Sequence, residues 1–177
     1  MGCADGKFVL PAARLGFEVV AIDVDEVALF GGYKNVVHMP GLRWRVKAEG
    51  LQDYVRILHG DFMSLKVDER THGVLTSGAL QYSRNLKYEL ATMVDRVLAR
   101  TLVGGLFYID FMLPFEEKYR GRPICPEAQW WKTYFRARTD WRVLYNRVLR
   151  PTLDRAHIEY PVDHYHQWGH LLAERLR

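Results

Sequence analysis

The sequence contains few cysteines and no long hydrophobic run. Cysteine occurs at only 2 of 177 positions, Cys3 and Cys125, which is too few for a disulfide framework. No stretch approaches the roughly 18 consecutive apolar residues that are needed to span a bilayer, and no secretory signal opens the chain. These absences predict a cytoplasmic protein that does not cross a membrane.

Blocks of like charge are also absent, although the chain is basic overall, with a net charge of +4 and a pI of about 9.1. Many basic residues lie between Lys118 and Arg155, but carboxylates are scattered among them and no run of roughly five or six like charges occurs. A nucleic-acid-binding face is one interpretation of this segment. We favour a solvated helical face, and therefore expect no nucleic-acid partner.

A third absence concerns the glycine pattern near the N-terminus. A dinucleotide-binding loop would read Gly-x-Gly-x-x-Gly, whereas here Gly2 and Gly6 are separated by Cys-Ala-Asp, with Ala4 where a middle glycine would stand. Asp5 lies inside the loop, and a carboxylate there repels phosphate but suits a ligand with an ammonium or sulfonium charge. The loop therefore argues against NAD and is compatible with S-adenosylmethionine.

The composition that remains is that of a globular protein, with 49% hydrophobic and 26% charged residues. At this length we expect one domain over residues 1–177. Residues 32–51 are ambiguous, with helical character at 42–51. The patterns predict helices at residues 8–15, 26–31 and 88–102, the last ended by Gly104 and Gly105, and strands at 18–23, 55–58, 73–76 and 106–112.

The C-terminal part has a different pattern. It predicts an aromatic-rich helix at residues 129–136 and extended segments at 141–150, 157–160 and 164–176. Strands that alternate with helices indicate a parallel sheet covered by helices, and the terminal extended segments indicate an antiparallel edge. The predicted fold class is therefore α/β: a Rossmann-like, doubly wound sheet, mostly parallel, with an antiparallel C-terminal strand.

Polar and small residues follow the predicted strands at the edge where open α/β sheets bind ligands. Asp23 ends the strand at 18–23 and can accept hydrogen bonds from ribose hydroxyls. Asp61 and Phe62 follow the next strand, where a carboxylate can accept from an adenine amino group and an aromatic ring can stack on the purine. Ser77 and Gly78 follow the strand at 73–76. Each could instead be a helix cap or turn residue, but together they favour a nucleoside site.

In order, the motifs Gly-Cys-Ala-Asp-Gly-Lys, Val-Val-Ala-Ile-Asp-Val-Asp, His-Gly-Asp-Phe, Ser-Gly-Ala-Leu-Gln-Tyr and Gly-Gly-Leu-Phe-Tyr-Ile occupy roughly residues 1–114. This series resembles the class I S-adenosylmethionine-dependent methyltransferases. The resemblance implies a seven-stranded sheet with six parallel strands and a last antiparallel one. It also implies S-adenosylmethionine as the cofactor, while it says little about the acceptor.

The same resemblance implies roles for individual residues. The loop residues Gly2, Asp5 and Gly6 would line the methionine part of the cofactor, and Asp23 would hold the ribose. The expected cofactor site comprises Gly2, Cys3, Asp5, Gly6, Asp23, Val24, Asp61, Phe62, Ser77, Gly78 and Gln81. Within it, Asp61 and Phe62 would contact adenine, and the last three residues would flank the methionine carboxylate and amino group.

The sequence departs from this family at its start, because the family's first strand and the acidic residue after it would precede Gly2. A misassigned or trimmed start, a true fragment, and a strand supplied by another chain are three explanations. We favour the first, which predicts that upstream coding sequence encodes an apolar strand ending in Asp or Glu. The first strand is thus expected to be missing from this chain.

Methyl transfer requires chiefly that acceptor and cofactor are aligned, so it leaves few marks in a sequence. Tyr82 follows Gln81 where the resemblance implies a residue that faces the methyl group. The ring of Trp131 could help to wall an acceptor pocket, although aromatic residues at helical spacing also form cores. We predict Tyr82 and His166 as catalytic residues, and Tyr82, Trp131, His166 and Trp168 as acceptor-binding residues.

Histidines recur near the C-terminus, where His164, His166 and His170 would share one face of a strand together with Trp168. Three imidazoles at this spacing could bind a metal, one of them could serve as a general base, or all could be hydrogen-bonded residues of a sheet edge. We expect no metal.

Taken together, the sequence predicts an enzyme that transfers a methyl group from S-adenosylmethionine to an O, N or S nucleophile of a small molecule. A homodimer is one expectation of this hypothesis. One alternative keeps the cofactor but uses its sulfonium group for intramolecular displacement or elimination, which releases methylthioadenosine. Another is a non-catalytic partner subunit.

Overall fold

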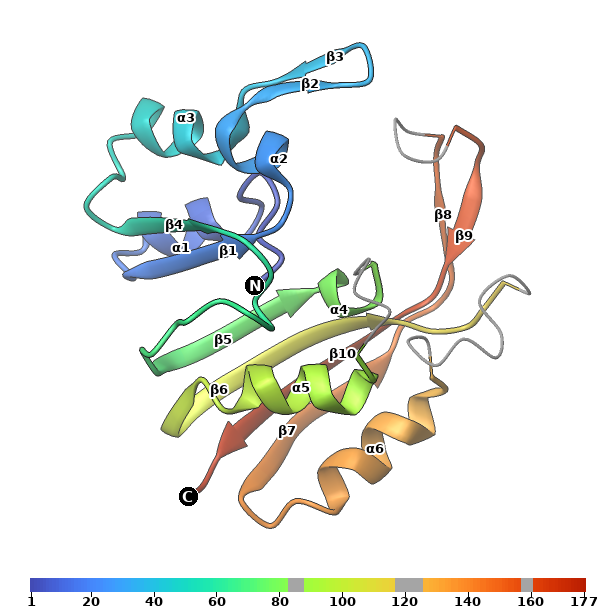
Figure 1. Ribbon diagram of the computed structural model, residues 1–177. Coiled ribbons are helices and arrows are strands. Elements are labelled where there is room, and N and C mark those ends of the chain that lie inside the picture. Colours follow the sequence, from blue (N-terminus) through green and yellow to red (C-terminus); the bar gives the residue numbers. More distant parts are fainter. Residues whose placement is uncertain (83–87, 117–125, 157–160) are drawn as a thin grey trace. The chain divides into compact units, whose positions relative to one another are not determined.

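The computed structural model describes residues 1–82, 88–116, 126–156 and 161–177, and the side chains of Gln81 and Tyr82 lie outside this description (Figure 1). Contacts divide the chain into two compact units, Met1–Val67 and Asp68–Arg177. Each is described by itself below. The expectation of one domain stays a prediction.

The first unit alternates short helices and strands. Its elements are α1 (Val9–Arg14), β1 (Val19–Asp23), α2 (Glu26–Phe30), β2 (Gly32–Lys34), β3 (Val37–Met39), α3 (Gly41–Ala48) and β4 (Val55–His59). β1 and β4 are parallel, in a register that runs from Val19 opposite Val55 to Asp23 opposite His59. The ambiguous residues 32–51 form the β2–β3 hairpin and α3. The helices and strands predicted before and after them are confirmed.

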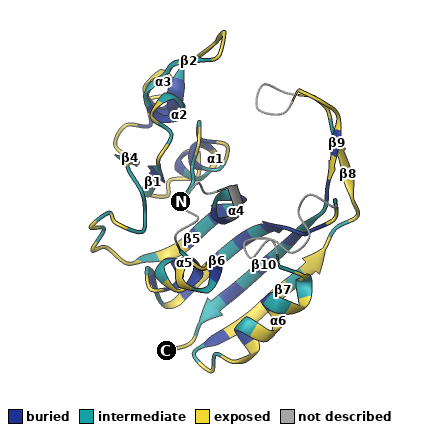
Figure 2. Ribbon diagram, turned by 45° about the vertical axis from the view of Figure 1, so that its right-hand side comes forward, coloured by how far each residue is buried: buried dark blue, intermediate teal, exposed yellow. Residues whose placement is uncertain are grey.

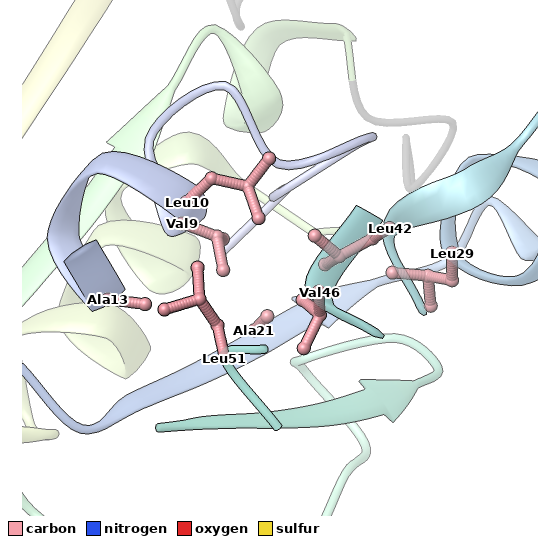
Figure 3. Packing of buried hydrophobic residues seen from close by; sticks show 8 residues of the cluster. All are labelled: Val9, Leu10, Ala13, Ala21, Leu29, Leu42, Val46 and Leu51. Carbon is pink, nitrogen blue, oxygen red and sulfur yellow. The ribbon is translucent and has the colours of Figure 1, made fainter. Parts of the chain in front are cut away.

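The core of the first unit is small and aliphatic, and lies between its helices and β1 (Figure 3). Leu29 of α2 and Leu42 of α3 are fully buried. The apolar residues of α1 repeat at helical spacing, so that they share one face. The buried cluster consists of Val9, Leu10, Ala13, Ala21, Leu29, Leu42, Val46 and Leu51.

The second unit contains β5 (Thr71–Ser77), α4 (Ala79–Tyr82), α5 (Leu90–Leu98), β6 (Thr101–Met112), α6 (Ala128–Arg136), β7 (Trp141–Val148), β8 (Thr152–Asp154), β9 (His164–His166) and β10 (Trp168–Arg175). Four of these strands form a sheet in the order β5-β6-β10-β7. β5 is parallel to β6, whereas β10 is antiparallel to both of its neighbours, β6 and β7. β8 and β9 form a separate antiparallel pair.

One face of this sheet is buried beneath α5 and α6 (Figures 1 and 2). In β6 the buried residues alternate, as expected for a strand with one covered face. Phe111 stacks on Trp131 of α6 at 4.6 Å between ring centroids, and Phe107 stacks on Phe135 at 6.1 Å. The helix α5 buries Leu90, Met93, Val94, Val97 and Leu98, the spacing that predicted it.

Two sequence predictions about this unit were wrong in detail. Gly104 and Gly105 do not end a helix but lie inside β6, because α5 ends at Leu98 and Thr101 already pairs with Thr71. The strand predicted at 164–176 is divided at Gln167 into β9 and β10. β10 is antiparallel as predicted and lies between β6 and β7, so that in the described residues β7, and not β10, is the edge strand on that side of the sheet. Residues 157–160 lie outside the described residues.

The mixture of helices with parallel and antiparallel strands confirms an α/β fold. In the described residues, β1-β4 and β5-β6 are the parallel pairs. A sheet of mostly parallel strands and a missing first strand therefore stay predictions.

Candidate functional site

The N-terminal loop is held against the end of β1 by its own backbone. The amides of Gly2 and Cys3 both donate to the carbonyl oxygen of Ile22, at 2.8 and 3.1 Å. The amide of Gly6 then donates to the carbonyl of Cys3 at 3.0 Å and closes a tight turn. Gly2, Ala4 and Gly6 all have positive φ angles, of 64°, 44° and 100°. The conformation is natural for glycine but strained for Ala4.

The carboxylate of Asp23 connects this loop to the start of α2. Its Oδ2 accepts from the amide of Ala4 at 2.7 Å, and its Oδ1 accepts from the amide of Asp25 at 2.9 Å. A carboxylate offers about four acceptor positions. The two bonds therefore leave capacity for a ligand's hydroxyl groups at the place where the sequence predicts them.

Asp25, two residues later, has a structural role. Its carboxylate caps α2 by accepting from the amide of Ala28 at 3.1 Å, and it pairs with Lys34 at 3.2 Å. Burial alone would raise the pKa of Asp25, but the hydrogen bonds from Ala28 and Lys34 hold the pKa below its ordinary value. Of the two carboxylates at this strand end, Asp25 therefore caps α2, whereas Asp23 binds the loop.

Asp5 and Gly6 are more constrained than the sequence suggested. Asp5 forms an ion pair with Arg45 of α3 at 3.0 Å, with both side chains about one third exposed. Gly6 is buried, and a Cβ atom there would lie 2.5 Å from Cδ1 of Leu42. Packing against α3 therefore explains this glycine without a ligand. The partnership with Arg45 was missed because no local pattern links residues 5 and 45.

Cys3, within the loop, is half-buried and packs against the apolar core of the first unit. Burial raises the pKa of its thiol to about 12, and the nearby carboxylate of Asp23 acts in the same direction. The thiol is therefore neutral at physiological pH and is no candidate for a nucleophile.

The end of β4 lies beside the end of β1. The amide of Gly60 donates to the carbonyl of Asp23 at 2.8 Å, and Nε2 of His59 lies 3.2 Å from the carbonyl of Val24. Asp61 accepts from the amide of Met63 at 2.9 Å and closes a turn, which is the role of a turn residue. The structure thus brings the loop, Asp23 and the Gly60–Asp61 segment together within the first unit. Val24 is exposed and Phe62 is half-buried.

In the second unit, Ser77 and Gly78 are both fixed by Asp110 of β6. The hydroxyl of Ser77 donates to Oδ2 of Asp110 at 2.7 Å, and the amide of Gly78 donates to its carbonyl at 3.2 Å. Oδ1 of Asp110 is buried and has no hydrogen-bond partner among the described residues. A carboxylate in the otherwise apolar run Leu-Phe-Tyr-Ile-Asp-Phe-Met was the available signal for this residue. Gln81 and Tyr82 lie in α4.

The predicted acceptor residues lie in different environments. Trp131 is fully buried against Phe111, which favours the core role that the sequence left open. His166 is buried and pairs with Asp154 at 2.7 Å, while Trp168 lies edge-on to His166 at 5.7 Å between ring centroids. His170 is separate from this group, and its Nδ1 lies 2.9 Å from the hydroxyl of Tyr108. Asp154 was not predicted.

A surface hollow of about 460 Å³ also lies in the second unit. It is lined by Leu113, Pro114, Phe115, Glu127, Ala128, Val148 and Gln167. None of the predicted site residues lines it, although Gln167 is the residue between His166 and Trp168.

No protein-family model matches the sequence. No curated protein matches it either. Among the described residues, no helix is both long enough and apolar enough to cross a membrane.

Solved structures, in contrast, resemble the chain over nearly its full length. TehB from Haemophilus influenzae has a TM-score of 0.71 at 15% identity, and the match covers 98% of this chain but 55% of TehB. A SAM-dependent methyltransferase from Methanosarcina mazei has a TM-score of 0.70 at 14% identity, with 99% of this chain and 90% of that one covered.

A third match is 1,6-didemethyltoxoflavin-N1-methyltransferase from Burkholderia thailandensis, solved with 1,6-didemethyltoxoflavin and S-adenosylhomocysteine bound. Its TM-score is 0.65 at 15% identity, with 99% of this chain and 69% of that one covered. The [4+2]-cyclase SpnF has the same fold, with a TM-score of 0.67 at 15% identity over 98% of this chain and 73% of its own. At these identities the similarity is one of fold.

Proposed function

Because this chain has the fold of the class I S-adenosylmethionine-dependent methyltransferases, we propose that it binds S-adenosylmethionine and transfers the methyl group to an O, N or S nucleophile of a small molecule. The observation that carries the proposal is the position of Asp23. Its carboxylate holds the glycine loop through Ala4, and its carbonyl holds the end of β4 through Gly60. The three segments that the motifs assign to one nucleoside meet at this residue.

In the proposed complex, the ribose hydroxyls donate to the remaining acceptor positions of Asp23. Adenine lies against Phe62 and Asp61, and the methionine part follows the loop of Gly2, Cys3, Asp5 and Gly6. The ion pair of Asp5 with Arg45 supports this assignment in a modified form. The methionine part carries an ammonium and a carboxylate, and a carboxylate beside a guanidinium offers a partner of opposite sign to each.

Further residues complete the proposal. Val24 follows the ribose-binding carboxylate, and Ser77, Gly78 and Gln81 are assigned to the methionine carboxylate and amino group. Tyr82 and His166 are the proposed catalytic residues for proton removal from the acceptor. Trp168 joins them as an acceptor contact, whereas we no longer favour Trp131.

The reaction is an in-line displacement at the sulfonium carbon. Most of the rate enhancement then comes from holding the nucleophile and the methyl carbon in alignment, with a base needed only where the acceptor must lose a proton. The small-molecule acceptor, a cytoplasmic location and a homodimer also remain proposals.

SpnF, whose name describes a [4+2]-cyclase, favours a second candidate function because it shows that this fold also serves reactions other than methyl transfer. The second candidate is a non-methylating use of S-adenosylmethionine, with displacement or elimination at the sulfonium group. Mass spectrometry of the spent cofactor separates the two. Methyl transfer leaves S-adenosylhomocysteine, and elimination or intramolecular displacement leaves methylthioadenosine.

The experiment incubates the purified chain with S-adenosylmethionine and a panel of small hydroxyl, amine and thiol compounds. Acceptor-dependent formation of S-adenosylhomocysteine supports methyl transfer. Methylthioadenosine above the level of spontaneous breakdown supports the second candidate and contradicts the first. Absence of both products, together with absence of cofactor binding, overturns the proposed function.

A further inference from the structure

The hairpin of β8 and β9 brings two histidines and one aspartate together. In the register of this pair, Asp154 lies opposite His164 and Thr152 lies opposite His166. Side chains two positions apart in a strand share a face. His164 and His166 therefore point to the same side, and each is only 5% exposed. Their ring centroids are 4.6 Å apart.

Both imidazoles are anchored through the same ring nitrogen. Nδ1 of His164 lies 2.9 Å from the carbonyl of Val162, and Nδ1 of His166 lies 2.7 Å from Oδ2 of Asp154. A carbonyl and a carboxylate can only accept, so each Nδ1 carries the proton. In a neutral ring the lone pair is then on Nε2. A histidine held at Nδ1 by a backbone carbonyl, as His164 is, is the usual arrangement of a metal ligand and its supporting partner. In His166 the nitrogen that faces Asp154 is Nδ1 itself. An ion shared with Asp154 would therefore replace the proton on Nδ1, and the proton of the neutral ring would then lie on Nε2.

The distances agree with a small cation. One possible ligand atom from each of Asp154, His164 and His166 lies within 4.8 Å of the others. Metal–ligand bonds of about 2.0–2.2 Å require ligand atoms that are somewhat closer to one another. Side-chain rotation of the partly exposed Asp154 can supply this approach, because 44% of its side-chain surface is accessible.

We propose that Asp154, His164 and His166 form a binding site for a divalent transition-metal ion, with Zn²⁺ as its probe. Two imidazole nitrogens and one carboxylate oxygen suit Zn²⁺ or Fe²⁺, whereas Mg²⁺ and Ca²⁺ prefer all-oxygen sites. Three protein ligands leave a further coordination position for water or for an oxygen, nitrogen or sulfur atom of a bound molecule. The proposal does not depend on S-adenosylmethionine binding.

The site differs from the metal hypothesis that the sequence allowed. That hypothesis grouped His164, His166 and His170 on one strand, but the strand is divided at Gln167 and His170 pairs with Tyr108. Asp154 takes the third position instead. A metal ion on His166 would use the lone pair that a general base needs. While the ion is bound, His166 would affect the acceptor only through the metal.

The test is a calorimetric titration of Zn²⁺ into the full chain, prepared without a histidine tag and stripped with a chelator. We expect saturable binding of one ion per chain, and no competition from excess Mg²⁺. Asp154→Asn and His166→Ala should each weaken binding by at least the roughly 10- to 100-fold that loss of a supporting partner costs. His170→Gln is the matched control, and it should leave the Zn²⁺ affinity unchanged.

Thermal unfolding of the same proteins is a second measurement, which shows whether a variant that fails to bind Zn²⁺ is still folded. Zn²⁺ should raise the melting temperature of the wild-type chain, because an ion that binds the folded state stabilises it, and should raise that of Asp154→Asn less. Absence of saturable Zn²⁺ binding to the wild-type chain overturns the proposal. So does binding that His170→Gln abolishes and Asp154→Asn leaves intact. Titration of S-adenosylmethionine into the same samples reports separately on the proposed function.

Discussion

Replacing Asp23 by asparagine separates the role of its charge from the role of its shape. The carboxylate oxygens of Asp23 accept from two backbone amides, those of Ala4 and Asp25, at 2.7 and 2.9 Å. Asparagine can accept at its oxygen, but its amide nitrogen is a donor. One of the two backbone donors must therefore face another donor.

The magnitude follows from these two bonds. A donor left without its partner costs about 1–3 kcal/mol, and the half-buried position of Asp23 points to the lower part of this range for the free energy of unfolding. For the cofactor, the variant also loses acceptor capacity toward the ribose. We expect the affinity for S-adenosylmethionine to fall by about 1–3 kcal/mol, which corresponds to roughly 5- to 150-fold.

Isothermal titration calorimetry with S-adenosylmethionine measures the affinity, and urea denaturation measures the stability. Asp53→Asn is a matched control, because Asp53 is an exposed aspartate of the same unit. The control should change neither quantity. If Asp23→Asn remains folded and binds S-adenosylmethionine as the wild type does, Asp23 does not hold the ribose. Unchanged stability would in turn refute its role in holding the loop.

Other predictions concern the N-terminal loop. Ala4→Gly should raise the free energy of unfolding by about 0.5–1 kcal/mol. Glycine removes the steric strain of the left-handed backbone at position 4, and this gain exceeds the conformational entropy that glycine adds to the unfolded chain. A lower urea midpoint for the variant would contradict this. Gly6→Ala should lower the free energy of unfolding by about 1–3 kcal/mol, because the added Cβ would clash with Leu42. The loss should exceed that of Gly16→Ala, whose added Cβ meets no atom within 4 Å. Equal losses would contradict the clash and show that the positive φ angle alone causes the loss of stability. Since the pKa of Cys3 is raised from 9.0 to about 12, its thiol should favour the folded state below pH 9, with this contribution lost as pH rises toward 12. Peptide mass spectrometry after iodoacetamide treatment should show slow labelling of Cys3 at pH 8, and rapid labelling would refute the burial of the neutral thiol.

Much of the fold was predictable because its signals are local. The apolar run of β1 and the repeating apolar residues of α5 and α6 each specify an element without reference to distant residues. The end of α5 was not predictable in this way. The pairing of Thr101 with Thr71 starts β6 before Gly104, and a tertiary contact thus overrides the usual role of glycine as a helix stop.

The candidate site was predictable to a similar extent. Asp23 followed from its position after a buried strand. The partners of the predicted residues could not be predicted from the sequence, because they depend on which distant chain segments meet in the fold. Arg45 beside Asp5, Asp110 beside Ser77 and Asp154 beside His166 are each separated from their partners by more than ten positions. Their presence changes the chemistry of the residues that they contact.

The most direct test of the central claim is a crystal structure of the chain with S-adenosylhomocysteine. We expect both ribose hydroxyls within hydrogen-bonding distance of the Asp23 carboxylate, with adenine beside Asp61 and Phe62 and the amino-acid part along the loop from Gly2 to Gly6. Adenosine bound away from Asp23, or no binding at saturating S-adenosylhomocysteine, would contradict it.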